Sequence, residues 1–388
     1  MYTPTPLPPS KPLFKPSLLG LMCLAAIAAQ SAQAGPTLSF GPDKSISLGL
    51  GLRASISHTE DGAPSGKDDL DINLDSMRLY LGGSLNKYVK ATFNTEKDAN
   101  DDIKLLDAIA RFEFSDSLNV WIGRMLPPSD RANLDGPYYL SAWSYPGVVS
   151  QYPARFAGRD NGLTLWGRLA DKKLTFAVGA FRGHNKFAGA SNEDGNLLYA
   201  GRLQYNFFDP EPNPAYYTSS TYYGAARVLA LAVAGMYQSD GVGSNVNKGD
   251  YKAWNLDALF EQKLTGGGVL TLEGAYYSYD IDDKTDVATN FGGAGPTDNV
   301  GGLSQGDGWL AGLAYLIPAK VGWGRFQPYV RYQTFEADLT KVTTKQSDVG
   351  VNYVIDGHNA RLSATYSKSE STGAPDTDRF VLGLQLQF

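Results

Sequence analysis

Apolar and polar residues alternate at every second position in segment after segment of this chain. In the last segment, residues 378–388, apolar side chains recur from Phe380 to Phe388 in steps of two, and Gln385 and Gln387 fall between them. A period of two predicts β-strands with one apolar face. No stretch after residue 34 reaches the 18 or more apolar residues of a transmembrane helix. The chain is therefore expected to be an all-β protein.

Sixteen segments with this alternation follow one another along the sequence. They span residues 45–57, 70–85, 87–97, 103–115, 117–125, 159–169, 172–182, 196–208, 225–238, 251–263, 267–280, 308–318, 324–337, 346–356, 358–369 and 377–388. Alternation is weak in 117–125 and 225–238, so the pattern does not define which side chains of these two segments face inward. The register of the other fourteen follows from their apolar positions.

The connections between these segments alternate in length. Longer ones, at 58–69, 98–102, 126–158, 183–195, 239–250, 281–307, 338–345 and 370–376, are separated by short turns, with one exception at 209–224. An even number of strands with this rhythm predicts a closed, 16-stranded antiparallel transmembrane β-barrel of the porin kind. A strand pair hidden in 209–224 would make eighteen strands. The alternative is a soluble sandwich or propeller, which would need a packed core beneath each apolar face.

The N-terminus has the features of an export signal. Two lysines precede an apolar run from Leu18 to Ala29, and residues 31–34 (SAQA) supply a small-residue cleavage site. We therefore expect residues 1–34 to be a cleaved signal peptide and residues 35–388 to form the barrel domain in the bacterial outer membrane. Cleavage would also remove Cys23, the one cysteine, which leaves no thiol for a disulfide, a metal site or catalysis.

The charge balance excludes one class of partner. Residues 1–34 contain two lysines and no acid, so the mature chain would hold 32 basic and 40 acidic residues, with a net charge of −8. No cluster of lysine and arginine interrupts this acidic background. Nucleic acid is therefore not expected as a partner.

Charged side chains occupy the polar faces of the predicted strands. An Arg or Lys on the lipid-facing side would cost about 2–4 kcal/mol at mid-bilayer, so the charged faces are assigned to the lumen. The predicted lumen wall includes Arg78, Lys90, Asp107, Arg111, Glu113, Arg159, Arg202, Asp257, Glu273, Arg331 and Arg361, with Arg53, Glu96 and Glu261 also inward. These groups would either solvate the lumen and pair across strands, or form rings that select ions.

The third long connection, residues 126–158, is the strongest candidate for a pore constriction. Loops of this length are uncommon and usually functional, and its prolines and aromatics favour a packed conformation. We expect it to fold into the barrel and to bring to the permeant the residues Asp130, Arg131, Asp135, Tyr138, Tyr139 and Arg155. The alternative is a surface loop packed on its own aromatic rings. The exceptional connection at 209–224, rich in tyrosine and proline, is expected to be a rigid turn at the membrane interface.

No catalytic or metal-binding pattern is present. The histidines, His58, His184 and His358, are distant in sequence, and neither an H-E-x-x-H motif nor a phosphate-binding glycine loop occurs. The acidic tracts at 67–75 and 96–102 lack the spacing of a calcium-binding EF-hand loop. We therefore expect no enzyme activity, no metal site and no cofactor.

Several segments resemble the phosphate-selective porins O and P. The similarity is carried by LLDAIARFEF (105–114), VWIGRMLPP (120–128), RFAGRDNGLTLWGRL (155–169), QPYVRY (327–332) and VGVNYVIDGHNARLSATY (349–366). The resemblance implies a sixteen-stranded barrel that assembles as a trimer, with its third loop folded inward. Phosphate-selective members use a ladder of inward arginines and a lysine cluster. This wall mixes its arginines with acids and has no lysine cluster, so phosphate selectivity does not carry over with the family.

Taken together, these features predict a passive diffusion channel for small hydrophilic solutes or inorganic ions, with anions such as phosphate as candidates. The expected partners are outer-membrane lipid and lipopolysaccharide, two further copies of the chain, and the barrel-assembly machinery, which would read the terminal Phe388. The alternatives are an outer-membrane hydrolase, which needs a Ser-His-acid set, and a plugged structural or adhesin barrel. About ten residues, 35–44, precede the first strand, which is short for an N-terminal plug.

Overall fold

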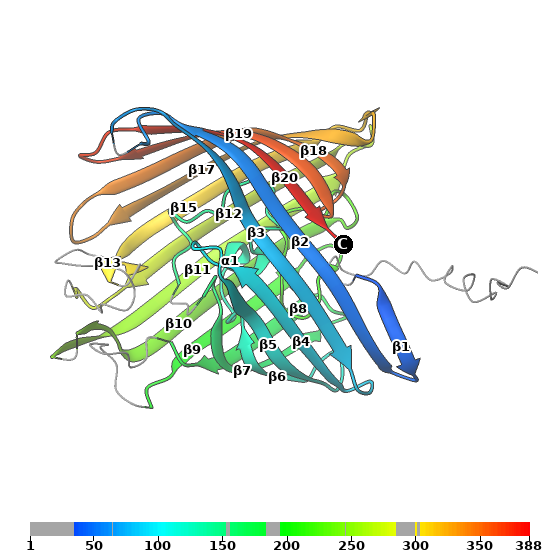
Figure 1. Cartoon of the computed structure of the whole chain (residues 1–388). Coiled ribbons are helices and arrows are strands. Elements are labelled where there is room, and N and C mark those ends of the chain that lie inside the picture. Colours follow the sequence, from blue (N-terminus) through cyan, green and yellow to red (C-terminus); the bar gives the residue numbers. More distant parts are fainter. Residues whose placement is uncertain are drawn as a thin grey trace, which may run out of the picture. The chain divides into compact units, whose positions relative to one another are not determined.

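Sixteen antiparallel strands form a closed barrel in the computed structural model (Figure 1). The structure describes residues 35–63, 65–152, 156–183, 195–244, 246–284, 299–300 and 303–388. The predicted signal peptide, Arg155 and His184 lie outside these described residues. The prediction of a 16-stranded barrel is confirmed.

The barrel strands follow chain order, and each pairs with its sequence neighbour. They are β2 (Lys44–Thr59), β3 (Asp69–Ser84), β4 (Val89–Lys97), β5 (Ile103–Glu113), β6 (Asn119–Met125), β7 (Asp160–Leu169), β8 (Leu174–Phe181), β9 (Leu198–Asn206), β10 (Val228–Ser244), β11 (Asn247–Lys263), β12 (Val269–Asp280), β15 (Gly306–Leu316), β17 (Gly324–Ala337), β18 (Thr343–Asp356), β19 (Ala360–Ser371) and β20 (Thr377–Gln387). Short turns join the strands at one end, here called the turn end, and longer connections join them at the loop end.

Four short strands lie outside this count. β1 (Thr37–Gly41) and β16 (Lys320–Val321) extend the barrel sheet at its turn end, and β13 (Asn299–Val300) pairs with β14 (Leu303–Ser304) in a separate hairpin. The two additional strands of the main sheet are thus β1 and β16. The segment 209–224 contributes no strand.

The last strand closes the barrel on the first, as expected. β20 pairs with β2 from Gly51 opposite Gln387 to Thr59 opposite Arg379. The Phe388 amide then donates to the Leu50 carbonyl at 2.9 Å, and the Leu50 amide donates to the Phe388 carbonyl at 3.2 Å. In Figure 1 the two strands lie side by side in blue and red.

The apolar faces point out of the barrel. Leu382 is 49 % exposed, whereas Gln385 on the same strand is fully buried in the lumen. The structure also supplies the two registers that alternation left open. On β6, Trp121 faces the lumen and Ile122 faces outward, and on β10 the outward residues include Leu231. Exposed apolar side chains around a barrel with a polar interior are typical of a lipid-facing wall.

Two local features differ from the expected strands. The connection placed at 239–250 is mostly strand, because β10 continues to Ser244 and β11 begins at Asn247. A β-bulge between Gln238 and Val242 absorbs the irregular alternation that made this stretch resemble a loop. A second bulge, on β5, leaves Leu106 fully buried although its position predicted an outward side chain.

Helix is almost absent. Within the described residues the one helix is α1 (Arg131–Asp135), in the third long connection. No helix of the described chain is long and apolar enough to cross a membrane.

Two connections fill much of the barrel interior. Loop three (residues 126–158) enters from the loop end, as predicted, and α1 lies inside the ring of strands (Figure 1). Segment 209–224 enters from the turn end, which corrects its expected position as an interfacial turn. Tyr216 is buried and donates its hydroxyl to the Leu126 carbonyl of loop three at 2.7 Å. The interior supplies hydrogen-bond partners for this polar segment that a lipid interface would lack.

Candidate permeation path

Arginines of the barrel wall hold loop three by its backbone carbonyls. Each donates one guanidinium N–H across the lumen to an oxygen of the loop, so the loop is fixed without a regular secondary structure. The contacts are Arg53 Nη2 to Trp143 O at 2.6 Å, Arg202 Nη1 to Ser129 O at 3.0 Å, Arg331 Nη1 to Ser144 O at 2.8 Å, and Arg361 Nη1 to Leu140 O at 2.6 Å. These arginines support the loop and are buried beneath it.

A fully buried cluster of four charges joins the two inserted segments to the wall. Arg131 of α1 makes a bidentate contact with Glu211 of segment 209–224, at 2.7 and 3.0 Å. Arg202 of β9 makes another with Asp257 of β11, at 2.5 and 2.9 Å. Arg131 Nε also lies 3.6 Å from Asp257 Oδ1. Two positive and two negative groups balance, which a buried cluster requires.

The acids that flank α1 are buried without a basic partner of their own. Asp130 caps the helix, accepts from the Asn133 amide, and accepts the Tyr277 hydroxyl of β12 at 2.8 Å. Burial raises the pKa of Asp130 to about 6. Burial also raises the pKa of Asp135 well above its ordinary value, and neither of its carboxylate oxygens has a hydrogen-bond partner among the described residues. Burial therefore disfavours the charged form of both carboxyls, so loop three brings less negative charge into the lumen than its two acids suggest.

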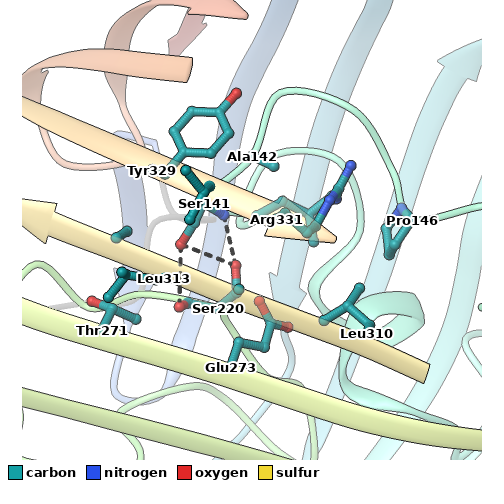
Figure 2. Close-up of a pocket in the computed structure, with 14 residues that line it drawn as sticks. Ser141, Ala142, Pro146, Ser220, Thr271, Glu273, Leu310, Leu313, Tyr329 and Arg331 are labelled. Atoms are coloured by element: carbon teal, nitrogen blue, oxygen red, sulfur yellow. Dashed lines mark hydrogen bonds between the residues drawn. The ribbon is translucent and has the colours of Figure 1, made fainter. Parts of the chain in front are cut away.

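The side of the lumen beneath β12, β15 and β17 is closed. Here the Ser141 amide of loop three donates to Ser220 Oγ of segment 209–224 at 2.6 Å, and Ser141 Oγ donates to the Ser220 carbonyl at 3.3 Å. Figure 2 shows these bonds beside Glu273 and Arg331 of the wall. The gap that remains has a volume of about 20 Å³, which holds little more than one water molecule.

The opposite side, along β3, β4 and β7, is open. A cavity of about 500 Å³ lies between this wall and loop three, and we call it the vestibule. A second cavity of about 40 Å³ shares Arg78, Gly136 and Arg159 with the vestibule and reaches Tyr217 of the segment from the turn end. The two cavities meet at these shared residues and form a candidate path, off the barrel centre, past loop three.

Arg78 and Arg159 stand where the two cavities meet. Arg78 Nε donates to Glu96 at 2.5 Å, and its guanidinium lies 4.9 Å from the centre of the Tyr138 ring. Arg159 Nε donates to Asp107 at 3.1 Å. Each guanidinium is thus oriented by one wall carboxylate, and both border the open space.

Nearer the turn end, the β4–β5 wall continues with partly exposed charges. Glu113 accepts from Lys90 Nζ at 2.7 Å and lies 3.6 Å from Arg111 Nε. Trp121 Nε1 donates to the same carboxylate at 3.2 Å, and the Arg111 guanidinium lies 5.6 Å from the Trp121 ring centre. One acid therefore serves two bases, which leaves a net positive charge at this level.

The structure thus divides the residues predicted from sequence into two groups. Arg78 and Arg159 line the open cavities, Asp107 binds Arg159, and Lys90, Arg111 and Glu113 lie on the neighbouring β4–β5 wall. Against the inserted segments or the closed gap lie Arg202, Asp257, Glu273, Arg331 and Arg361, and within loop three Asp130, Arg131, Asp135, Tyr138 and Tyr139 are mostly buried. Glu211 and Tyr217, in segment 209–224, were not predicted from the sequence. The available signal for an inserted segment was Glu211 between Pro210 and Pro212, because a turn at the membrane interface does not need an acid at this position.

One contact bears on the hydrolase alternative. His358 Nε2, in the turn between β18 and β19, lies 3.1 Å from Ser219 Oγ and 2.9 Å from the Thr221 carbonyl. Its Nδ1 has no hydrogen-bond partner among the described residues, so no acid orients the ring. Ser219 is itself buried beneath Tyr139. A serine nucleophile needs access and an oriented base, and this pair supplies neither.

Structures of outer-membrane proteins share this fold. OprB of Pseudomonas putida aligns over 88 % of this chain and 94 % of its own at 10 % identity, with a TM-score of 0.60. OmpF of Salmonella typhi aligns over 89 % and 98 % at 10 % identity, TM-score 0.57, and a trimer form of Vibrio cholerae OmpT over 89 % and 100 % at 12 % identity, TM-score 0.53. Identities this low show the fold alone.

The match to a protein family covers the C-terminal part of the chain. No curated protein sequence matches the chain. Residues 296–388 match the sequence model of the family of phosphate-selective porins O and P. These residues include β15, β17, β18, β19 and β20, the strands that complete the barrel. The last quarter of the chain therefore carries the sequence pattern of this porin family, on a barrel with the fold of outer-membrane porins.

Proposed function

We propose that the protein is a porin, a passive diffusion channel of the bacterial outer membrane for small hydrophilic solutes and ions. The eccentric path past loop three carries this proposal, because it offers charged, partly exposed groups inside a closed, outwardly apolar barrel. Transport would follow the concentration gradient, without a covalent step or a cofactor.

The charges along the path balance. Among the described residues, five bases, Arg78, Lys90, Lys97, Arg111 and Arg159, face five acids, Asp75, Glu96, Asp98, Asp107 and Glu113. No strong preference for anions or for cations follows from this balance. Strong selection of phosphate would need further cations that these ion pairs do not provide.

Recording from planar bilayers tests the channel directly. Purified protein is expected to insert with stepwise increases in conductance, and the reversal potential in a KCl gradient is expected to show only a weak preference between chloride and potassium. Repeating the gradient with phosphate salts separates general anion preference from phosphate selectivity. Absence of stepwise conductance from correctly folded protein would refute the channel.

We further propose that residues 1–34 are removed during export and that three copies of residues 35–388 assemble in the membrane. The trimer form in which Vibrio cholerae OmpT was solved supports this assembly by analogy of fold. Lipid, lipopolysaccharide and the barrel-assembly machinery would be its partners in the membrane. Cross-linking of the protein in outer-membrane vesicles, followed by mass spectrometry of the N-terminus, tests both points.

A further inference from the structure

The vestibule is larger than passage of a hydrated ion requires. Its volume of about 500 Å³ lies within the roughly 300–1,000 Å³ typical of sites for small organic molecules. The cavity below it holds about 40 Å³. A solute that enters from the loop end therefore pauses in a roomy compartment above a narrow one, where its lining can select it.

The floor of the vestibule presents hydrogen-bond donors. Arg78 donates Nε to Glu96, and its side chain also hydrogen-bonds to Tyr80. Arg159 donates Nε to Asp107 and Nη1 to the Ala157 carbonyl, and both guanidinium groups line the vestibule. Glu96 is occupied, since it also accepts from Ser76 Oγ and the Met77 amide. A floor made of two guanidinium groups favours a group that accepts only, such as a carboxylate, over a neutral sugar hydroxyl.

Loop three contributes aromatic rings to the same cavity. Tyr145, Tyr152 and Phe156 are half-buried and line it. The Tyr152 hydroxyl donates to Asn255 Oδ1 at 3.0 Å, and that of Tyr145 lies 2.5 Å from Ser150 Oγ. Because the two tyrosine hydroxyls are engaged by protein groups, the three side chains offer mainly ring surface to a solute. An apolar or aromatic body can pack on this surface, and an inorganic anion cannot use it.

The net charge of the lining limits the charge of the ligand. Asp75, Glu96 and Asp98 balance Arg78, Lys97 and Arg159. Asp98 is held by Lys104 and by amides of its own turn, whereas Asp75 is exposed and would repel a second carboxylate. A neutral lining with one anion-binding floor suits a single negative charge.

We propose that the vestibule is a binding subsite for small monocarboxylates with an aromatic or alicyclic body. The carboxylate binds the guanidinium groups of Arg78 and Arg159, and the ring packs against Tyr152 and Phe156. This inference rests on the proposed function for its biological use, since it names the class of solute that the channel would favour. It does not require that inorganic phosphate be a preferred solute.

Benzoate, acetate and inorganic phosphate are the probes that test it. Added from the loop side during single-channel recording in KCl, benzoate is expected to interrupt the current at roughly tenfold lower concentration than acetate, because an aromatic contact adds about that factor. The double variant Tyr152→Leu/Phe156→Leu is expected to lose the preference for benzoate over acetate. Equal interruption by benzoate and phosphate, or an unchanged preference in the double variant, would overturn the subsite.

The arginines are tested separately. Arg78→Gln and Arg159→Gln are each expected to weaken interruption by benzoate and acetate alike, whereas Arg325→Gln, an exposed arginine on β17 at the turn end, is expected to leave both unchanged. Calorimetric titration of benzoate into the detergent-solubilised barrel distinguishes the two proposals. Benzoate binding without conductance would support the subsite and refute the porin. Conductance without binding, in folded protein, would refute the subsite alone.

Discussion

An inward arginine in this barrel has one of two roles, and position along the strand does not reveal which. Alternation correctly predicts that Arg78, Arg202 and Arg331 point into the lumen, because a lipid-facing charge is costly. It does not predict that Arg202 and Arg331 hold loop three while Arg78 borders the path. That division depends on where the loop's carbonyl oxygens lie, a long-range property without a local sequence signal.

Arg131 is the residue whose removal should cost most stability. Arg131→Met leaves Glu211 buried without its bidentate partner, so the free energy of unfolding is expected to fall by about 3–5 kcal/mol. The double variant Arg131→Met/Glu211→Gln removes both charges and is expected to recover part of the loss. Urea unfolding of the barrel in lipid vesicles measures the free energy of unfolding of the unaltered protein, the single variant and the double variant.

Lys368→Met is the matched control, because Lys368 contacts Glu370 and Asp376 at the exposed loop end of β19. Its unfolding is expected to match that of the unaltered protein, since exposed ion pairs contribute little. If Arg131→Met unfolds like this control, the buried cluster is not a major support of loop three.

At the scale of elements, one inserted segment could be predicted from sequence and the other could not. The length and aromatic content of loop three predict a packed, functional loop. Segment 209–224 has the tyrosines and prolines of an interfacial turn, and its polar partners lie far away in the chain: Glu211 binds Arg131, and Ser220 binds Ser141. Composition alone cannot show whether a short connection rich in aromatic residues lies at the membrane interface or inside the barrel.

A disulfide across the closed gap tests whether the path is eccentric. Ser141 Oγ and Ser220 Oγ lie 3.4 Å apart, close enough for Ser141→Cys/Ser220→Cys to form a disulfide with small local adjustment. Oxidation is expected to lock loop three to segment 209–224 and to leave single-channel conductance unchanged, because solute passes on the β3–β7 side. Recordings before and after a reducing agent measure the effect.

The single variant Ser141→Cys controls for the added thiol and for oxidant. A substantial fall in conductance on oxidation of the double variant alone would mean that solute passes between Ser141 and Ser220. The path would then have to be placed beneath β12–β17, where the structure leaves about 20 Å³.

At the scale of the whole molecule, the barrel could be predicted almost completely. Sixteen alternating segments and the rhythm of short and long connections determine strand number, pairing order and closure, because a transmembrane sheet cannot leave an open edge. The seam between β2 and β20 follows from the same rule. Two deviations are bulges: one extra residue at Leu106 shifts the alternation on β5, and two extra residues between Gln238 and Val242 interrupt it on β10.

Phe388 lies at this seam with its ring exposed and its backbone paired to Leu50. Deleting it removes both of these backbone bonds and the terminal aromatic, so we expect lower yield of folded barrel in the outer membrane. The channels that do assemble are expected to conduct normally, because Phe388 is remote from the path. Heat-modifiable mobility on gels measures the folded fraction, with Phe388→Tyr as the control that keeps an aromatic. Normal yield after deletion would exclude a role in assembly.

The balance of charge along the path should set the sign of ion preference. Lys90 and Arg111 share Glu113, so this level of the path carries one excess positive charge. Lys90→Gln/Arg111→Gln changes the described charges of the path from five bases and five acids to three bases and five acids. The reversal potential in a KCl gradient is therefore expected to shift towards cation preference.

Arg331→Gln/Arg361→Gln removes the same number of positive charges from arginines that hold loop three instead of lining the path. If the path is where the cavities place it, this variant changes conductance through its effect on loop three but leaves the ion preference unchanged. An equal shift towards cations in both double variants would mean that the summed charge of the whole lumen governs permeation, as the field of distant groups can in a narrow pore. A shift in the first variant alone assigns selectivity to the β4–β5 wall.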